Sequence, residues 1–197
     1  MRYWLVGTVV ILMFVGSTAD SQEGKSKEPD KDPKTPTFKA PDKVLNKSFD
    51  AWRKDLKSID PSKRETAMKA ITEFGPDKAQ TVIPDILGEL QRHKSRPVDL
   101  SVRVNGLMAL STIFGGMRSM KKDPDPKLIK EAVGVYRMAL RDDQVILRVR
   151  ALQGLPFLGS AAEEAIDDVL RLVQDPDTWE VRKEAIPVLV MLAAKEK

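Results

Sequence analysis

The residues best suited to chemistry in this sequence are a single histidine and one cluster of carboxylates. His93 is the one histidine and cysteine is absent, which excludes thiolate metal sites, disulfides and a cysteine nucleophile. The clustered carboxylates are Glu163, Glu164, Asp167 and Asp168. Carboxylate oxygens bind Ca²⁺, but acidic residues also stabilise the start of a helix. We interpret the cluster as a helix N-terminus, and His93, which stands among cations, as the solvated end of another helix.

The composition supports one packed domain and excludes most enzyme classes. The chain has 197 residues, of which 42% are hydrophobic and 6% aromatic, enough for one ordinary domain with a core. Its formal net charge of +4 is far below that of a dedicated nucleic-acid binder. No pair of carboxylates has a spacing diagnostic of acid–base catalysis. We therefore expect no catalytic, cofactor-binding or metal-binding residues, no cofactor and no nucleic-acid partner.

The first 19 residues have the pattern of a secretory signal. Arg2 precedes an apolar run of about 14 residues, shorter than the roughly 20 that span a bilayer as a helix. Ser17 and Ala19 are small residues at the −3 and −1 positions of a cleavage site before Asp20. The pattern predicts export to the periplasm or the medium after cleavage. An uncleaved segment that anchors the chain to a membrane is the alternative.

Residues 20–43 have the composition of a disordered linker. They include six Lys, six acidic residues and four Pro, but only one large apolar side chain, Phe38. Such a segment buries too little apolar surface to offset the entropy of ordering it. We interpret 20–43 as a tether to a folded domain over 44–197.

One pattern recurs four times in the second part of the chain. Each copy has an arginine, a small residue three positions later, a second small or β-branched residue and closing apolar residues. The four arginines are 39, 45 and 34 residues apart, and they are Arg64, Arg103, Arg148 and Arg182. The spacing predicts amphipathic helices over 63–75, 102–114, 147–159 and 181–193. We expect the small residues to let helices approach closely, and Pro156 and Pro187 to interrupt the last two helices.

Further helices are predicted between these copies. Apolar spacings of three and four predict second helices over 82–90, 132–142 and 165–175, with Pro84 tolerated in a first turn. A helix over 46–58 that contains Trp52 precedes the first copy. Long loops are expected around 91–97 and 115–126.

The Arg-x-x-small-x-x-small-Leu run and the Val82-Ile83-Pro84 and Ala165-Ile166 starts resemble the HEAT-repeat family, in particular the short HEAT-like repeats of exported bacterial proteins. The resemblance implies an all-α fold, a right-handed α-α superhelix of about four repeats. It also implies a ladder of Asp and Arg side chains that ties successive repeats together. The ladder residues would be Asp60, Arg64, Asp99, Arg103, Asp143, Arg148, Asp177 and Arg182.

Two surfaces are candidates for binding a partner. By resemblance, the second helices line a concave groove, which would be basic at Lys127, Lys130, Arg137 and Arg141 and acidic at the cluster over 163–168. A charge-patterned peptide suits such a groove better than a nucleic acid, whose phosphates the acidic part would repel. A merely solvated face is the alternative.

The second surface is the helix over 181–193, which no further helix follows in the sequence. Ile186, Val190 and Met191 would normally pack on a second helix of the same repeat. Solenoid ends need a polar cap for solubility, so this end is either self-covered or a surface for docking or self-association.

The sequence as a whole therefore predicts an exported, non-enzymatic scaffold that binds a protein or peptide through the groove, the last helix or both. A homo-oligomer through the last helix is one form of this prediction. The alternatives are a HEAT-like enzyme of lyase or glycosylase type, and a weak nucleic-acid binder.

Overall fold

Helices make up the described protein, apart from one short hairpin. The computed structural model describes residues 39–92, 99–175 and 178–194, and within them the fold is all-helical, as predicted. The expected signal over 1–19, and the expected linker as far as residue 38, lie outside the described residues.

The described chain begins with the hairpin of β1 (Lys43–Val44) and β2 (Lys47–Ser48). The strands are antiparallel, with Lys43 opposite Ser48, and Leu45 and Asn46 turn the chain with φ of 48° and 62°. Positive φ at both turn residues is typical of tight hairpins. The helix predicted from 46 is therefore wrong at its start.

Helix α1 (Phe49–Asp55) follows directly, because Ser48 caps it with its Oγ 3.3 Å from the Ala51 amide. Trp52 is buried, and its indole Nε1 donates to the Val44 carbonyl at 2.9 Å. This bond fastens the hairpin to α1.

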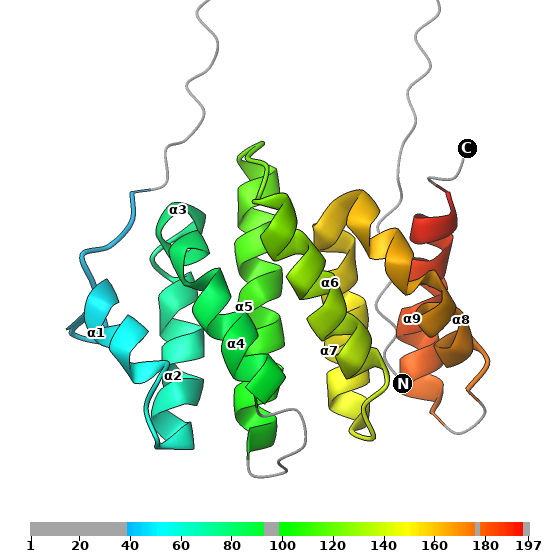
Figure 1. Ribbon diagram of the computed structural model, residues 1–197, viewed down its shortest axis with the longest axis horizontal. Helices are drawn as coiled ribbons and strands as arrows, with labels where there is room; N and C mark the ends of the chain where they lie inside the picture. Colours follow the sequence, from blue (N-terminus) through cyan, green and yellow to red (C-terminus); the bar gives the residue numbers. More distant parts are fainter. Residues whose placement is uncertain (1–38, 93–98, 176–177, 195–197) are drawn as a thin grey trace, which may run out of the picture. The chain divides into compact units, whose positions relative to one another are not determined.

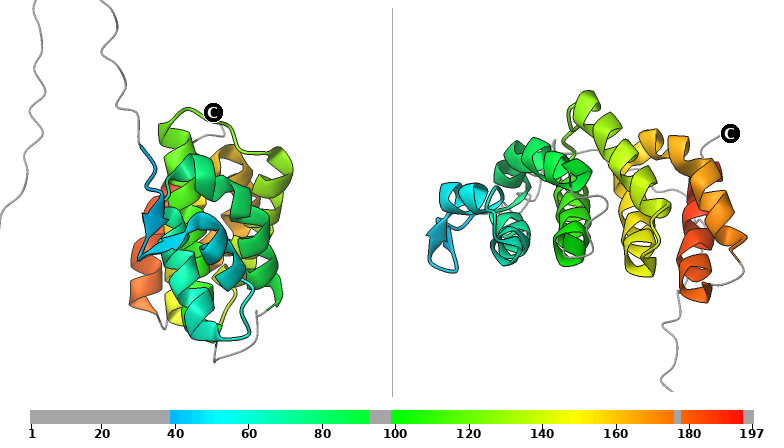
Figure 2. Two further views of the ribbon diagram at one scale, coloured as in Figure 1. Left: turned by 90° about the vertical axis from the view of Figure 1, so that its left-hand side faces the viewer. Right: turned by 60° about the horizontal axis from the view of Figure 1, so that its bottom comes forward.

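The longer helices lie in two rows, which the right-hand view of Figure 2 separates. The first row consists of α2 (Pro61–Thr72), α5 (Leu100–Ser119), α7 (Val145–Gly154) and α9 (Trp179–Ala193). In this row α2 packs on α5, α5 on α7 and α7 on α9. Each of these helices contains one of the four repeated arginines, so the four-fold pattern in the sequence corresponds to this row.

The second row consists of α1, α4 (Ile83–Arg92), α6 (Pro126–Leu140) and α8 (Ile166–Val173). Helix α4 packs on α6 and α6 on α8, and in Figure 1 these helices lie in front of α5, α7 and α9. The second helices predicted from sequence are α4, α6 and α8. Helix α1 packs on α2, and the right-hand view of Figure 2 shows it at the level of the second row.

Two short segments carry the chain from the first row back to the second. Gly75, with φ of 80°, turns the chain into α3 (Pro76–Ala79) and the 3₁₀ turn η1 (Gln80–Val82), which leads into α4. Between α7 and α8 lies the 3₁₀ segment η3 (Leu155–Ala165), which Gly159 breaks with φ of 68°.

Two predicted helix boundaries are wrong. The loop expected from 115 begins only after Ser119, because Met117 is buried and holds the last turn of α5 in the core. Pro156 does not interrupt a helix, because α7 ends at Gly154 and Pro156 stands in the first turn of η3, where its missing amide costs no helical bond. Pro187 does lie inside α9, as expected.

The small residues of the repeat do permit close approach. A Cβ on Gly106 would lie 2.8 Å from Leu90 Cδ2. A Cβ on Gly154 would lie 2.5 Å from Ser111 Oγ and 2.6 Å from the hydroxyl of the fully buried Tyr136. Real Cβ atoms do not reach such distances, so a side chain at Gly154 would displace the buried Tyr136, and one at Gly106 would make the end of the Leu90 side chain shift.

Candidate interaction surfaces

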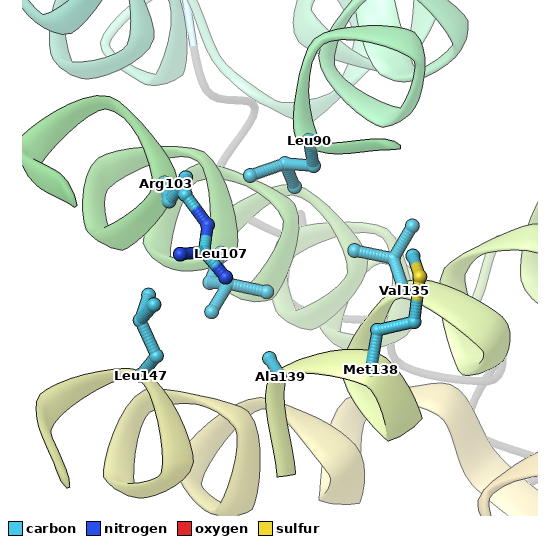
Figure 3. Close-up of a pocket in the computed structure, with 7 residues that line it drawn as sticks. All are labelled: Leu90, Arg103, Leu107, Val135, Met138, Ala139 and Leu147. Carbon is cyan, nitrogen blue, oxygen red and sulfur yellow. The ribbon is translucent and has the colours of Figure 1, made fainter. Parts of the chain in front are cut away.

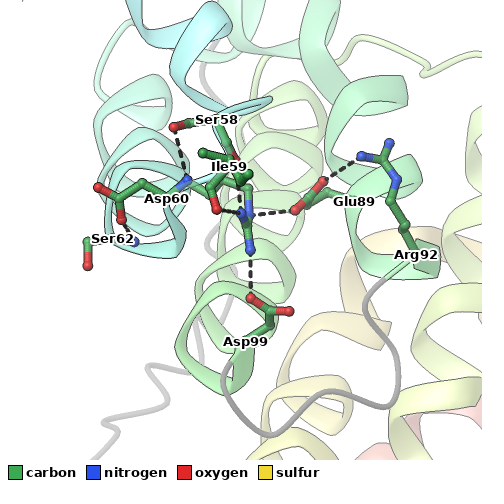
Figure 4. A network of polar contacts seen from close by, with 8 residues as sticks. Ser58, Ile59, Asp60, Ser62, Glu89, Arg92 and Asp99 are labelled. Atoms are coloured by element: carbon green, nitrogen blue, oxygen red, sulfur yellow. Dashed lines mark hydrogen bonds and ion pairs between the residues drawn. The ribbon is translucent and has the colours of Figure 1, made fainter.

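Arg64 is the centre of a buried polar network between three helices (Figure 4). Its Nη2 lies 2.6 Å from Asp99 Oδ1 and its Nε 2.6 Å from Glu89 Oε1, and both carboxylates are buried. Its Nη1 donates to the carbonyls of Ser58 and Ile59 at 2.8 and 3.0 Å. One guanidinium therefore joins the loop before α2 to α4 and to the residue that precedes α5.

Arg103 and Arg148 repeat this arrangement along the row. Arg103 pairs with Asp142, on the loop before α7. Arg148 donates to the Asp142 carbonyl at 2.8 Å and to Thr178 Oγ1, on the loop before α9, at 3.2 Å. Each arginine thus reaches forward to the residue or loop that begins the next first-row helix.

Two of the predicted acidic partners differ from the observed ones, and a third lies outside the described residues. Asp143 is exposed and offers Arg148 its carbonyl, while the carboxylate that meets Arg103 belongs to Asp142. Asp60 does not pair with Arg64, because its Oδ1 caps α2 at the Ser62 amide, 2.9 Å away. Asp177 lies outside the described residues.

The predicted basic groove residues lie along one face of α6, and two of them are held by an acid. Arg137 Nε donates to Asp168 Oδ2 and Arg141 Nε to Asp168 Oδ1, both at 2.8 Å, and Arg171 also pairs with this carboxylate. Lys127 and Lys130 are exposed on the same face. Burial alone would raise the pKa of Asp168, but the hydrogen bonds from Arg141 and Arg137 outweigh it and hold the pKa below its usual value. The pairing accounts for Arg137 and Arg141 without a partner molecule.

Asp85 on α4 is held in the same way, a contact that was not predicted from the sequence. Arg53 Nε lies 3.0 Å and Lys57 Nζ 2.9 Å from its carboxylate oxygens. At both Asp168 and Asp85, two basic residues four positions apart pair with an aspartate on the next second-row helix. We call each such group a clamp. The i, i+4 spacing of Arg53 and Lys57 could have predicted this contact from the sequence. It matches the spacing of Arg137 and Arg141, so α1 corresponds to α6 in the second row.

Replacement of Asp168 by asparagine tests this clamp through pH. Since the pKa of Asp168 is lowered in the folded state, its ionised form stabilises the fold above the usual carboxyl pKa of about 3.9, and the contribution is lost as pH falls through the folded-state value. We expect D168N to lower the free energy of unfolding by about 1–3 kcal/mol at neutral pH, and to reduce the further loss in acid.

Urea unfolding followed by circular dichroism across this pH range measures both effects. D167N, at the exposed neighbour on α8, is the control and should change the free energy of unfolding by less than about 0.5 kcal/mol. Equal acid sensitivity of D168N and the unchanged chain would contradict the assignment.

The outer face of α9 exposes three large apolar side chains beside Lys183, and the described residues do not cover it. Ile186 is 52% exposed and Val190 is 65% exposed. Trp179 lies on the same face, two helical turns before Ile186, and is also exposed. Met191, predicted to share this face, is instead half-buried and packs against the core. Trp179 was missed because it stands outside the four-residue spacing that defined the repeat.

The repeat itself shows how unusual this exposure is. Ile186 stands four positions after its arginine, Arg182, and the equivalent residues after the other three arginines are Met68, Leu107 and Leu152. These are 0%, 1% and 0% exposed, because the next helices along the rows cover them. The α9 face is therefore of the same kind as the packing surfaces inside the fold, but no helix within the described ranges covers it.

One small cavity lies between α4, α5, α6 and α7 (Figure 3). Its volume is about 20 Å³, room for a single water molecule, and its lining is apolar except for Arg103. No carboxylate is among its lining residues.

Within the described residues, no three histidine, aspartate or glutamate side chains are grouped as a metal site would need. No helix in that part of the chain is long and apolar enough to cross a membrane. His93 lies outside the described residues. No protein-family model, curated protein or solved structure matches this chain.

Proposed function

We propose that this chain is an exported, non-enzymatic scaffold with a HEAT-like superhelical fold, which holds a protein partner on the outer face of α9. The fold part of the proposal is supported by the two rows of helices and by arginines that tie each first-row helix to the next. Export is supported by the signal-like residues 1–19, and it predicts a mature N-terminus at Asp20, which intact-mass measurement would detect.

The observation that carries the interaction role is the exposure of Ile186. Three residues at equivalent repeat positions are fully buried, while Ile186 and Val190 face outward. Exposed apolar faces of this kind are typical of protein-binding surfaces. The α6 face is the weaker candidate, because Asp168 already engages two of its four cations.

Site-specific photo-crosslinking in the cell of origin tests the proposed surface. A photoreactive side chain at Ile186 should give one discrete cross-linked protein, and Val190→Glu in the same chain should remove that product. The matched control is a photoreactive side chain at Ile146, a less exposed apolar residue on α7. Equal products from both positions, or none at Ile186, would refute the proposal.

A further inference from the structure

The two ends of the described helix rows are unlike, and they complement one another. Along the chain, second-row and first-row helices alternate, beginning with α1 in the second row and finishing with α9 in the first. A second copy placed beyond α9 would present its α1 and then its α2. That order continues the alternation without a gap.

The arginine ladder is also incomplete at both ends of the described chain. Within that part of the chain, an acidic residue at one end has no arginine partner, and an arginine at the other end has no carboxylate partner. Asp60 precedes Arg64 by four residues, as Asp99 precedes Arg103, so Asp60 occupies the acceptor position of a preceding repeat. Among the described residues Asp60 pairs with no cation, and its side chain accepts a hydrogen bond from the Ser62 amide, the cap that Figure 4 shows. Arg182, the last donor, reaches only the carbonyl of Asp175 within the described chain. The acceptor and the donor therefore match in charge and in position.

Exposed apolar side chains gather at the same two ends. Within the described chain, the five most exposed large hydrophobic residues are Ile59, Leu45, Val190, Trp179 and Ile186. Ile59, which is 97% exposed, adjoins Asp60, and Leu45 forms the tip of the hairpin beside α1. An open depression of about 600 Å³ lies at the same end, lined by Lys47, Ala51, Lys54, Asp55, Lys57, Ser58 and Lys63. Its lysines suit the face of an indole such as that of Trp179, which Lys183 already approaches at 5.5 Å.

From these observations we infer that the partner of the α9 face is a second copy of this chain, which meets it head to tail through its α1 end. The inference rests on the proposed function, since both use the α9 face. Arg182 of one copy then pairs with Asp60 of the next, as Arg64 pairs with Asp99 within the chain. Because the two contact surfaces differ, the contact is heterologous and adds further copies until a ring closes or a filament grows.

Light scattering across a concentration series, on the chain from Asp20 onward, tests the inference with two variants and their mixture. Val190→Glu spoils the α9 face and Ile59→Glu spoils the α1 end, and both positions are exposed, so folding is preserved. For the unchanged chain we expect the mean mass to rise beyond that of a dimer. Each variant alone should require a concentration more than about tenfold higher, because the contact would bury an unpaired carboxylate. An equimolar mixture should form a dimer and nothing larger, since each variant keeps the end that the other lacks.

Ile146→Glu is the matched control on α7 and should associate like the unchanged chain. Asp60→Asn keeps the cap on α2 but loses the charge, and it should weaken association less than Ile59→Glu. A wild-type dimer that Ile59→Glu leaves intact would overturn the head-to-tail contact while keeping the α9 face as the partner surface. A chain that stays monomeric at every concentration would overturn the inference alone, because the cross-linking at Ile186 judges the proposed function separately.

Discussion

Replacement of Arg64 by alanine is expected to lower the free energy of unfolding by about 3–5 kcal/mol. The guanidinium lies between the buried carboxylates of Glu89 and Asp99, with 2.6 Å to each, and its removal takes the positive charge from between them. The substitution also removes the hydrogen-bond donor to the carbonyls of Ser58 and Ile59. Such a loss is a large share of the 5–15 kcal/mol typical of a folded domain. Urea unfolding of R64A and the unchanged chain, followed by circular dichroism, measures the difference.

Lys69→Ala is the control for Arg64→Ala. Lys69 lies on the same helix and pairs with Glu65 at 2.6 Å, but this pair is exposed to solvent. Exposed pairs at i, i+4 contribute only about 0.3–0.5 kcal/mol. If the two variants lost equal stability, the network around Arg64 would not hold the repeats together.

The sequence predicted the helices better than the contacts between them. Periodic apolar residues placed both rows, because burial of one face sets the spacing along a helix. The N-terminal hairpin was not predicted, since Leu45 matches by coincidence the helical spacing of Phe49 and Trp52, which do lie in α1. What decides against a helix there is the tertiary bond from the Trp52 indole to the Val44 carbonyl, together with the Ser48 cap.

The arginine–acid ladder was also predicted only in part. The repeated arginines were found from their spacing, whereas the acid that meets Arg103 is Asp142 and not its neighbour Asp143. Two adjacent aspartates in a loop are equivalent in sequence, and only the path of the loop decides which one faces the preceding helix. The Asp168 clamp was likewise not predicted, because the four-residue spacing of Arg137 and Arg141 does not show which other helix supplies their acid.

Leu152→Ala and Ile186→Ala together test whether the α9 face is open in the single chain. The two residues are similar in size and occupy the same position relative to their arginines, but Leu152 is fully buried and Ile186 is half-exposed. Removal of a buried leucine side chain costs about 2–5 kcal/mol, through lost burial and the cavity left behind. Removal of a side chain that solvent already reaches costs less than about 1 kcal/mol.

The comparison is made by urea unfolding in dilute solution, where copies of the chain do not meet. Under these conditions a cost of Ile186→Ala equal to that of Leu152→Ala would mean that the chain covers its own α9 face, and the surface would not be free for any partner. A small cost in dilute solution, with a loss of association at high concentration, has the opposite meaning. In that case a second molecule buries the side chain of Ile186, whereas the chain itself buries Met68, Leu107 and Leu152 at the equivalent positions.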